Sequence, residues 1–544
     1  MFQLRWGISP TKERVMAKSS STVTVPETGY RRGAVILLGL IGAIQVADPI
    51  VSSLALVKAS DELNFTASIQ ALAAGVSTLA LAAFAISGGV LADRLGRRGV
   101  LMASLIVSSI GELLTAVSSD PVTYIAGRVI TGMALAITFG SAYAMLRAVS
   151  SEKSLGSAMA MFNVLNGVVP VVVMVLAGIL MGVNWRLAYV LLPIVAFVLF
   201  WFIRPVLPKM PKTGGGKVDY FGLIFVGVGI ASLLYGISNA AGGITKPAFI
   251  APVVAGVIAF VLFAIVENRS KHAVFPIKIL THPAFLGAVI MGIFWNFAAG
   301  GLSQMLPNIW QYVTHIPASL IGVAQLPMSA AGVIGSLLAG ALLSRGVAAR
   351  FISVTGYGLL VLAFIELSFV DAKSGFLVFL FGMIVAGIGY MMNATTQGNL
   401  FLTLAPKSAY GAVTSSKMAV GQFGYALGLT GTSTLVSLFT LSKVNELSKG
   451  AVSGEENWDA ITSYMSTGST TNSALSAISV TDIEAAYSTA FNTTTLISGA
   501  VVLIAGIVMF ISLSRKKAAI PVDDFLAGVT TVPAAAPAAK GAKK

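Results

Sequence analysis

The chain has 544 residues, of which 56% are hydrophobic and only 10% are charged, and its mean hydropathy is +0.87. A soluble protein carries about 25% charged residues, so this composition indicates a polytopic membrane protein and excludes an ordinary soluble enzyme. The absence of cysteine excludes disulfides and thiolate metal sites. The net charge of +14 comes from basic residues spread over short loops, which a bilayer explains better than a nucleic-acid partner.

Fourteen apolar runs of near-spanning length follow one another along the chain. They lie at 33–57, 67–91, 100–118, 121–146, 155–182, 186–203, 219–240, 247–267, 284–314, 317–344, 350–370, 374–399, 410–440 and 488–513. An even number of spans places both termini on one side of the membrane. If that side is the inside, 28 of the 35 Lys and Arg residues are inner and only six are outer, as the positive-inside rule requires.

The runs predict an all-α membrane protein with two six-helix bundles and an inserted helix pair. The expected order is as follows: an inner tail at 1–32, a bundle at 33–203, a Pro- and Gly-rich linker at 204–218, the inserted pair at 219–267, a linker at 268–283, a bundle at 284–513 and a disordered inner tail at 514–544. The polar outer stretch at 441–487 is read either as a flexible cap or as the site of a short amphipathic helix.

The segment between the second and third runs carries four charges in six residues, which are too costly to place in hydrocarbon. It is therefore predicted to be a short inner loop, with Gly89 allowing close helix contact and Gly96 allowing a tight reversal. The set that defines this segment is Gly89, Asp93, Arg94, Gly96, Arg97 and Arg98. This pattern resembles the signature between the second and third helices of the major facilitator superfamily. The resemblance implies that these residues form a conformational latch.

The second half of the chain carries a weaker echo of this segment at Gly340, Ser344 and Arg345, which supports two repeats. Fourteen spans, together with the stretch from Asp48 to Val57, resemble the drug:proton antiporter branch of the superfamily. One departure concerns the fifth helix, where Gly167 and Pro170 remain but the tandem Gly-Pro of that branch is absent. The direction of transport is therefore less secure than the fold.

Four ionisable residues lie well inside predicted spans, where a charge is expensive and faces a cavity or a partner. They are Asp48, Glu112, Arg128 and Glu366. Depths estimated from the helical rise bring the first three close enough to form a pair or triad. We expect Asp48 to be the main protonation site and Arg128, which keeps its charge, to tune it as a switchable counter-charge, with Glu112 as a further proton-coupling candidate. The alternative is a static ion pair, and for Glu112 and Glu366 a purely structural carboxylate.

The superfamily resemblance implies that the first and fourth helices of each bundle line the substrate route. In the second bundle these helices carry amides and aromatic residues that suit an amphipathic ligand, and about half of them are expected to face the cavity. The candidates are Trp295, Asn296, Gln304, Asn308, Tyr390, Asn393 and Gln397. Asp48 makes a cationic ligand compatible with the route without requiring one.

The chain lacks a phosphate-binding GxxxxGK[ST] loop and an HExxH pair, and its three histidines fall near predicted loops, so neither an ATP-driven pump nor a metalloenzyme is expected. The prediction is a monomeric, multi-pass cell-membrane transporter with both termini cytoplasmic. It would use no cofactor, metal or nucleic acid, and would couple protons to the efflux of small amphipathic compounds. The alternatives are a proton-coupled uptake symporter and a non-transporting membrane protein on the same fold.

Overall fold

A computed structural model describes residues 29–65, 67–210, 212, 219–239, 243–270, 275–316, 320–371, 374–452 and 457–528. Most of both predicted tails, at 1–28 and 529–544, therefore lies outside the described residues. Where the chain is described it is almost entirely helical, as the apolar composition predicts. Within a bilayer a helix satisfies its own backbone hydrogen bonds, which loops and open sheets cannot do.

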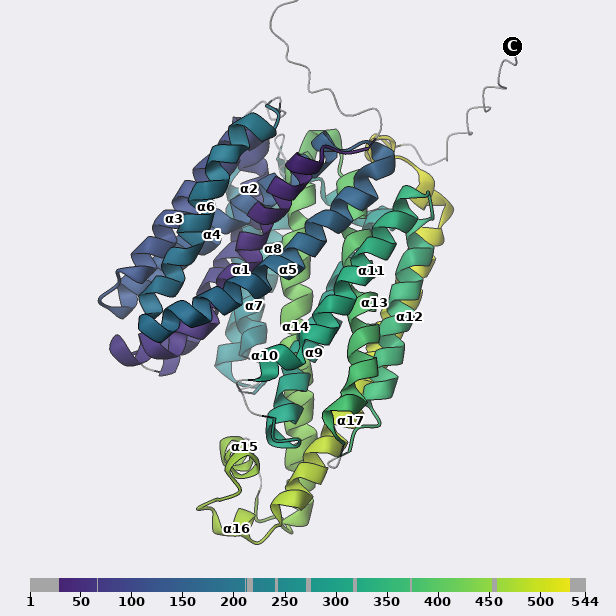
Figure 1. Cartoon of the computed structure of the whole chain (residues 1–544). Helices are drawn as coiled ribbons and strands as arrows, with labels where there is room; N and C mark the ends of the chain where they lie inside the picture. Colours follow the sequence, from purple (N-terminus) through teal and green to yellow (C-terminus); the bar gives the residue numbers. More distant parts are fainter. Residues whose placement is uncertain are drawn as a thin grey trace, which may run out of the picture.

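The first six helices form one unit, which we call the N-bundle (Figure 1). They are α1 (Arg32–Glu62), α2 (Ala67–Leu95), α3 (Arg97–Ala116), α4 (Pro121–Met145), α5 (Leu155–Val183) and α6 (Trp185–Val206). Within the unit α4 packs on α2 and α3, while α1 packs on α5 and α6.

Six long helices from the second half form the C-bundle. They are α9 (Pro283–Tyr312), α11 (Leu326–Ser344), α12 (Ala349–Leu367), α13 (Phe376–Leu404), α14 (Tyr410–Leu447) and α17 (Val480–Ser514). The short helix α10 (Ile321–Ala324) precedes α11 directly, and α18 (Val522–Leu526) follows α17. Helix α13 packs on α11 and α12, while α9 packs on α14 and α17.

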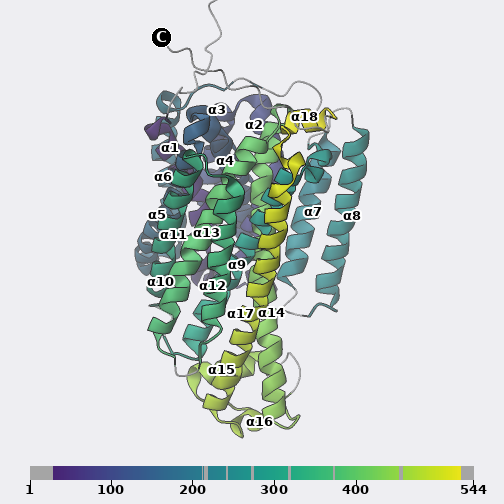
Figure 2. The same cartoon turned by 90° about the vertical axis from the view of Figure 1, so that its right-hand side faces the viewer.

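The inserted pair consists of α7 (Tyr220–Ser238) and α8 (Pro247–Arg269), which pack on each other. Helix α7 also packs on α2 and α14. Figure 2 shows the pair at one edge of the molecule, with α8 outermost. Since α2 belongs to the N-bundle and α14 to the C-bundle, α7 touches both halves at the place where they meet.

Thirteen helices in the described part of the chain are long and apolar enough to cross a membrane. Helix α14 is the fourteenth long helix and lies outside that set, because its sequence is rich in Ser, Thr and Gly and contains Lys417. It corresponds to the predicted span at 410–440 and lies between α2 and α9, where protein rather than lipid covers much of its surface.

The segment predicted as a loop between the second and third spans is almost entirely helical, so that expectation was wrong in extent. Asp93 and Arg94 occupy the last turn of α2, Arg97 and Arg98 begin α3, and only Gly96 lies between the helices, with φ +98°. Charges are excluded from hydrocarbon but not from a helix that projects beyond it. The glycine supplies the one backbone conformation that other residues rarely adopt.

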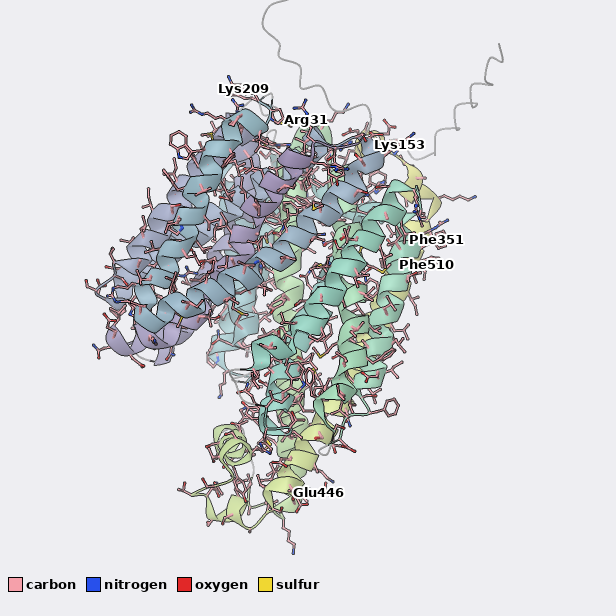
Figure 3. The ribbon with its side chains drawn as sticks, in the orientation of Figure 1. Arg31, Lys153, Lys209, Phe351, Glu446 and Phe510 are labelled. Carbon is pink, nitrogen blue, oxygen red and sulfur yellow. The ribbon has the colours of Figure 1, made fainter. Side chains whose placement is uncertain are left out.

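The outer stretch at 441–487 is likewise largely structured in its described part. Helix α14 continues to Leu447, α15 (Trp458–Thr467) and α16 (Ser473–Ser476) follow, and α17 begins at Val480. Figure 3 labels Glu446 at this end of the molecule, while Arg31, Lys153 and Lys209 lie at the other. We call the latter the basic end, which also holds Arg97 and Arg98.

The two bundles meet at the basic end through residues with small side chains. A β-carbon on Gly89 of α2 would lie 2.1 Å from the carbonyl oxygen of Gly411 of α14. Across the second contact, between α5 and α11, the hydroxyls of Ser157 and Ser344 are 2.8 Å apart. Figure 1 shows the bundles diverging from this end toward the end that carries α15 and α16. The protein is therefore held in a conformation closed at the basic end.

Replacing Gly89 with Val should open this contact, because the added side chain would overlap the backbone of α14. The cysteine-free chain allows a direct measurement: Ser157→Cys with Ser344→Cys should cross-link on oxidation, and Gly89→Val should lower the cross-linked fraction. Gly75→Val on the same helix is the control, since nothing lies within 4 Å of its β-position. Full cross-linking in the Gly89 variant would contradict the role given to this contact.

Candidate functional site

A buried ion pair joins α1 to α4 inside the N-bundle. The two terminal nitrogens of Arg128 donate to the two carboxylate oxygens of Asp48, over 2.7 Å and 2.9 Å. Both residues are 1% exposed. Ser77 of α2 donates a further hydrogen bond of 2.9 Å to Asp48. This bidentate arrangement is the strongest geometry available to a guanidinium and a carboxylate, and it uses both oxygens of Asp48.

Glu112 of α3 completes a triad, with one carboxylate oxygen 3.4 Å from an Arg128 nitrogen. Its other oxygen has no hydrogen-bond partner among the described residues, and neither does the Nε of Arg128. Two carboxylates and one guanidinium thus share a site that is almost inaccessible to solvent. The cluster is balanced in charge when it holds one proton, and it carries one uncompensated negative charge when it does not.

Glycines bring the helices of this triad together. A β-carbon on Gly111 of α3 would lie 2.7 Å from the backbone nitrogen of Thr131, and one on Gly127 of α4 would lie 2.7 Å from that of Thr115. The two helices can approach this closely only because neither glycine has a side chain. Glu112 and Arg128 directly follow these two glycines in sequence, so the close approach brings the carboxylate to the guanidinium.

Glu62, the last residue of α1, anchors that end of the helix to α6 and lies beyond its membrane-spanning part. The indole nitrogen of Trp185 donates to it over 2.6 Å and Arg186 over 2.7 Å. The hydrogen bond from Trp185 is the main reason why the pKa of Glu62 lies below its ordinary value. Tyr189, one turn further along α6, places its ring 5.4 Å from the Arg128 guanidinium.

The residues predicted as a latch meet the N-terminus of α14. Asp93 accepts two hydrogen bonds from Arg97 through one oxygen, and its other oxygen accepts the backbone N–H of Gly411 over 2.5 Å. The unpaired N–H groups at a helix N-terminus favour a negative charge there. Arg97 also lies 4.6 Å from the ring of Tyr410. Sequence reasoning did not single out Tyr410 and Gly411, because the partner of the latch is about 320 residues away in the chain.

The remaining latch arginines have other surroundings. Arg98 donates to the carbonyl oxygens of Leu207 and Arg204, over 3.1 Å and 3.4 Å, and so ties the start of α3 to the end of α6. Arg94 lies in the last turn of α2. Arg147, which the sequence analysis did not include, donates to the carbonyl oxygen of Leu402 across the bundle interface over 2.9 Å.

Three of the predicted cavity residues meet in the C-bundle. The indole nitrogen of Trp295 donates to the side-chain oxygen of Gln397 over 3.0 Å, and its ring stacks on Tyr390 with 6.3 Å between ring centroids. This group presents a flat aromatic surface beside an amide, which suits an amphipathic ligand.

The other cavity candidates are placed differently. Asn393 is fully buried, bonds to the carbonyl oxygen of Gly389 in its own helix and lies against Gly356 of α12. Asn296 bonds to the carbonyl oxygen of Gly292 and lies beside α14. Both are therefore packing residues in this conformation. Gln304 and Asn308 lie half-buried further along α9.

Glu366, the third acid predicted inside a span, is separate from the triad. It lies half-buried on α12, and a β-carbon on Gly382 of α13 would lie 2.2 Å from its carboxylate.

Removing Arg128 should destabilise the N-bundle strongly. Arg128→Gln would leave two buried carboxylates without a counter-charge, a change that costs about 3–5 kcal/mol for buried pairs. Adding Asp48→Asn to the same chain should restore part of the loss, because the stranded carboxylate is then gone. The measurement is a double-mutant cycle on thermal unfolding in detergent. Strictly additive effects would show that the two side chains do not interact.

Residues 36–429 of the chain match the Major Facilitator Superfamily. The methylenomycin A resistance protein of Bacillus subtilis is 26% identical over 342 residues, which cover 62% of this chain and 73% of that protein. The puromycin resistance protein of Streptomyces alboniger is 26% identical over 318 residues, covering 58% and 63%. An uncharacterised transporter of Mycobacterium tuberculosis is 24% identical over 376 residues, covering 68% of this chain and 54% of its own length. The chain thus spans little more than half the length of some of the curated relatives it matches.

Solved structures share the fold at low identity. The human organic anion transporter MFSD10 aligns with a TM-score of 0.55 at 14% identity, covering 86% of this chain and 98% of its own. A bacterial homologue of the iron transporter ferroportin, in an outward-facing state, aligns with a TM-score of 0.56 at 14% identity, covering 88% and 99%. The sequence match extends from α1 into α14, and the helices it covers are arranged as in these transporters, so the chain belongs to the Major Facilitator Superfamily.

Proposed function

We propose that this protein is a secondary active transporter of the cell membrane that couples protons to the efflux of small amphipathic compounds. The observation that carries the proposal is the buried triad of Asp48, Arg128 and Glu112. A cluster with two acids, one permanent cation and almost no solvent changes its charge whenever a proton enters or leaves. That is the property a proton-coupled transporter requires.

The geometry suggests how the proton is held. While Arg128 binds both oxygens of Asp48, Glu112 makes the longer contact of 3.4 Å to Arg128 and lies within hydrogen-bonding reach of Asp48. We propose that Glu112 holds the proton in this conformation. When the helices shift and Arg128 turns toward Glu112, Asp48 takes the proton instead. Arginine stays charged throughout and acts as a movable counter-charge.

The proposed cycle is alternating access by the two bundles, taken as 33–203 and 284–513, with both termini cytoplasmic. The contacts that join the bundles at the basic end include a glycine pair, two hydroxyls, the Asp93 carboxylate at the start of α14 and the hydrogen bond from Arg147 to Leu402. Such contacts have few atoms to separate and are made by rigid helices. They can therefore break and re-form as the bundles rock, and they keep the cytoplasmic side closed in the present conformation.

Export rather than import is supported by the relatives, which are named for resistance to methylenomycin A, to puromycin or to multiple drugs. Uptake with protons is the second candidate. It is favoured by the missing tandem Gly-Pro in α5, where Gly167 has open space beside it and Pro170 stands alone.

The test uses inverted membrane vesicles, a pH-sensitive dye and a panel of amphipathic compounds, including ethidium. If adding a compound releases protons from vesicles that are acidic inside, the result would support efflux. If the compound enters the vesicles only when the proton gradient is reversed, the result would support uptake. If no compound on a broad panel moves and none shifts the proton gradient, the transport proposal fails.

Asp48→Asn and Glu112→Gln should each abolish proton-driven accumulation of a transported compound, because neither amide can exchange a proton. Exchange of that compound between the two sides without a gradient should persist, since the variants still allow the bundles to rock. Glu446→Gln is the matched control, as this acid is exposed and forms an ion pair with the exposed Lys443. Unchanged proton coupling in both triad variants would identify the triad as a static structural ion pair.

A further inference from the structure

Lys417 of α14 is a cation inside the transmembrane region that the proton mechanism does not use. It lies seven residues into the helix, about 10 Å from its start, and it is half-buried. Near the inner end of a span, a long lysine side chain can reach the membrane surface. In the structure its ammonium group instead turns across the bundle interface to α4, 5.4 Å from the ring of Tyr143 and 6.0 Å from that of Phe139.

The surroundings of Lys417 differ from those of the other buried cations. Arg128 has Asp48 and Glu112, and Arg97 has Asp93. Among the described residues no carboxylate forms an ion pair with Lys417, and no hydrogen bond of its ammonium is found. Aromatic faces attract a cation, but they do not replace the negative charge that buried cations normally pair with. An anion would therefore bind here favourably.

A continuous set of contacts leads from Lys417 to the aromatic group of the C-bundle. The hydroxyl of Tyr143 donates to the carbonyl oxygen of Gly398. The adjacent residue, Gln397, accepts the indole N–H of Trp295, which stacks on Tyr390. The structure therefore offers a cation at the interface between the bundles and a flat aromatic surface in the C-bundle, joined through α13.

The charges elsewhere on the route argue against a cationic ligand. Asp48 was the acid that made a cation compatible with the route. In the structure both of its oxygens are taken by Arg128 and it is 1% exposed, so it offers nothing to a ligand in this conformation.

We propose that Lys417 is the anion-binding residue of the substrate site, so that the transported compounds are small aromatic acids rather than amphipathic cations. This inference rests on the proposed transport function and narrows its substrate class. The carboxylate of the ligand takes the place that a protein carboxylate fills at Arg128, and its flat body packs on Trp295 and Tyr390. No bond is made or broken.

The test compares three probes with the same ring system: anthracene-9-carboxylate, its neutral carboxamide and the cation 9-(aminomethyl)anthracene. Binding to the purified full-length protein in detergent is followed by the change in probe fluorescence. The carboxylate should bind roughly tenfold or more tightly than the other two, the size expected for a hydrogen bond between charged groups. Lys417→Gln should remove this preference, and Lys417→Arg should keep it.

Lys443→Gln is the matched control, because it removes an exposed lysine from the far end of the same helix. Thermal unfolding of each variant verifies that the fold is retained. Equal binding of the three probes to the unmodified protein would overturn the proposal, and so would a carboxylate preference that survives in Lys417→Gln.

Transport of the same probes in inverted vesicles separates this inference from the function it rests on. If the protein binds the carboxylate selectively through Lys417 but moves none of the probes, the anion site stands and the transport proposal loses support. If it exports the cationic probe in preference to the carboxylate, the transport proposal stands and the anion site is wrong.

Discussion

The structure depends on the cost of placing charge where there is no water. Asp48 and Arg128 meet from different helices with two hydrogen bonds and almost no exposed surface. Either charge alone at that depth would be strongly destabilising, so the pair fixes how α1 and α4 are rotated toward each other. The close approach of α3 and α4 at Gly111 and Gly127 then brings Glu112 to the same point. Each protonation of such a site changes the net charge of a cluster that is almost inaccessible to solvent, so its stability depends on how many protons it holds.

The interface between the bundles follows a different principle. Inside each bundle, large side chains pack into a continuous core, and buried aromatic residues such as Tyr124, Tyr189 and Phe364 fill it. Toward the basic end the bundles meet through glycines, hydroxyls, one carboxylate at a helix N-terminus and apolar residues such as Phe401 and Leu402, which share a core with the N-bundle. In the proposed cycle, movement of the halves would break and re-form these polar contacts. We propose that the latch residues act on the equilibrium between conformations, since Asp93 and Gly89 lie at the contact between the two halves.

Lys417 is the exception to the pairing of buried charges, and the exception is informative. Arg128 and Arg97 each have a carboxylate partner, while Lys417 has two aromatic faces. It comes from the C-bundle and its rings come from the N-bundle, so rocking of the bundles changes its surroundings. A ligand anion at this point would interact with the same moving interface that the latch controls, which gives a physical route from binding to conformation.

The order and lengths of the spans, the basic end and the depths of Asp48, Glu112 and Arg128 could be predicted from the sequence, because hydropathy, charge bias and helical rise act locally along the chain. The loop predicted around Gly96 was too long. Charged residues indicate where a span leaves the hydrocarbon, but a helix can continue beyond that point. The partners of the side chains depend on helix rotation and on contacts hundreds of residues apart. Only the tertiary structure could show that Asp93 binds Gly411, that Asn393 bonds within its own helix instead of facing a cavity, and that Lys417 lies near Tyr143. Local physics thus determined which segments enter the membrane, and the packing of one helix on another decided which residues face each other there.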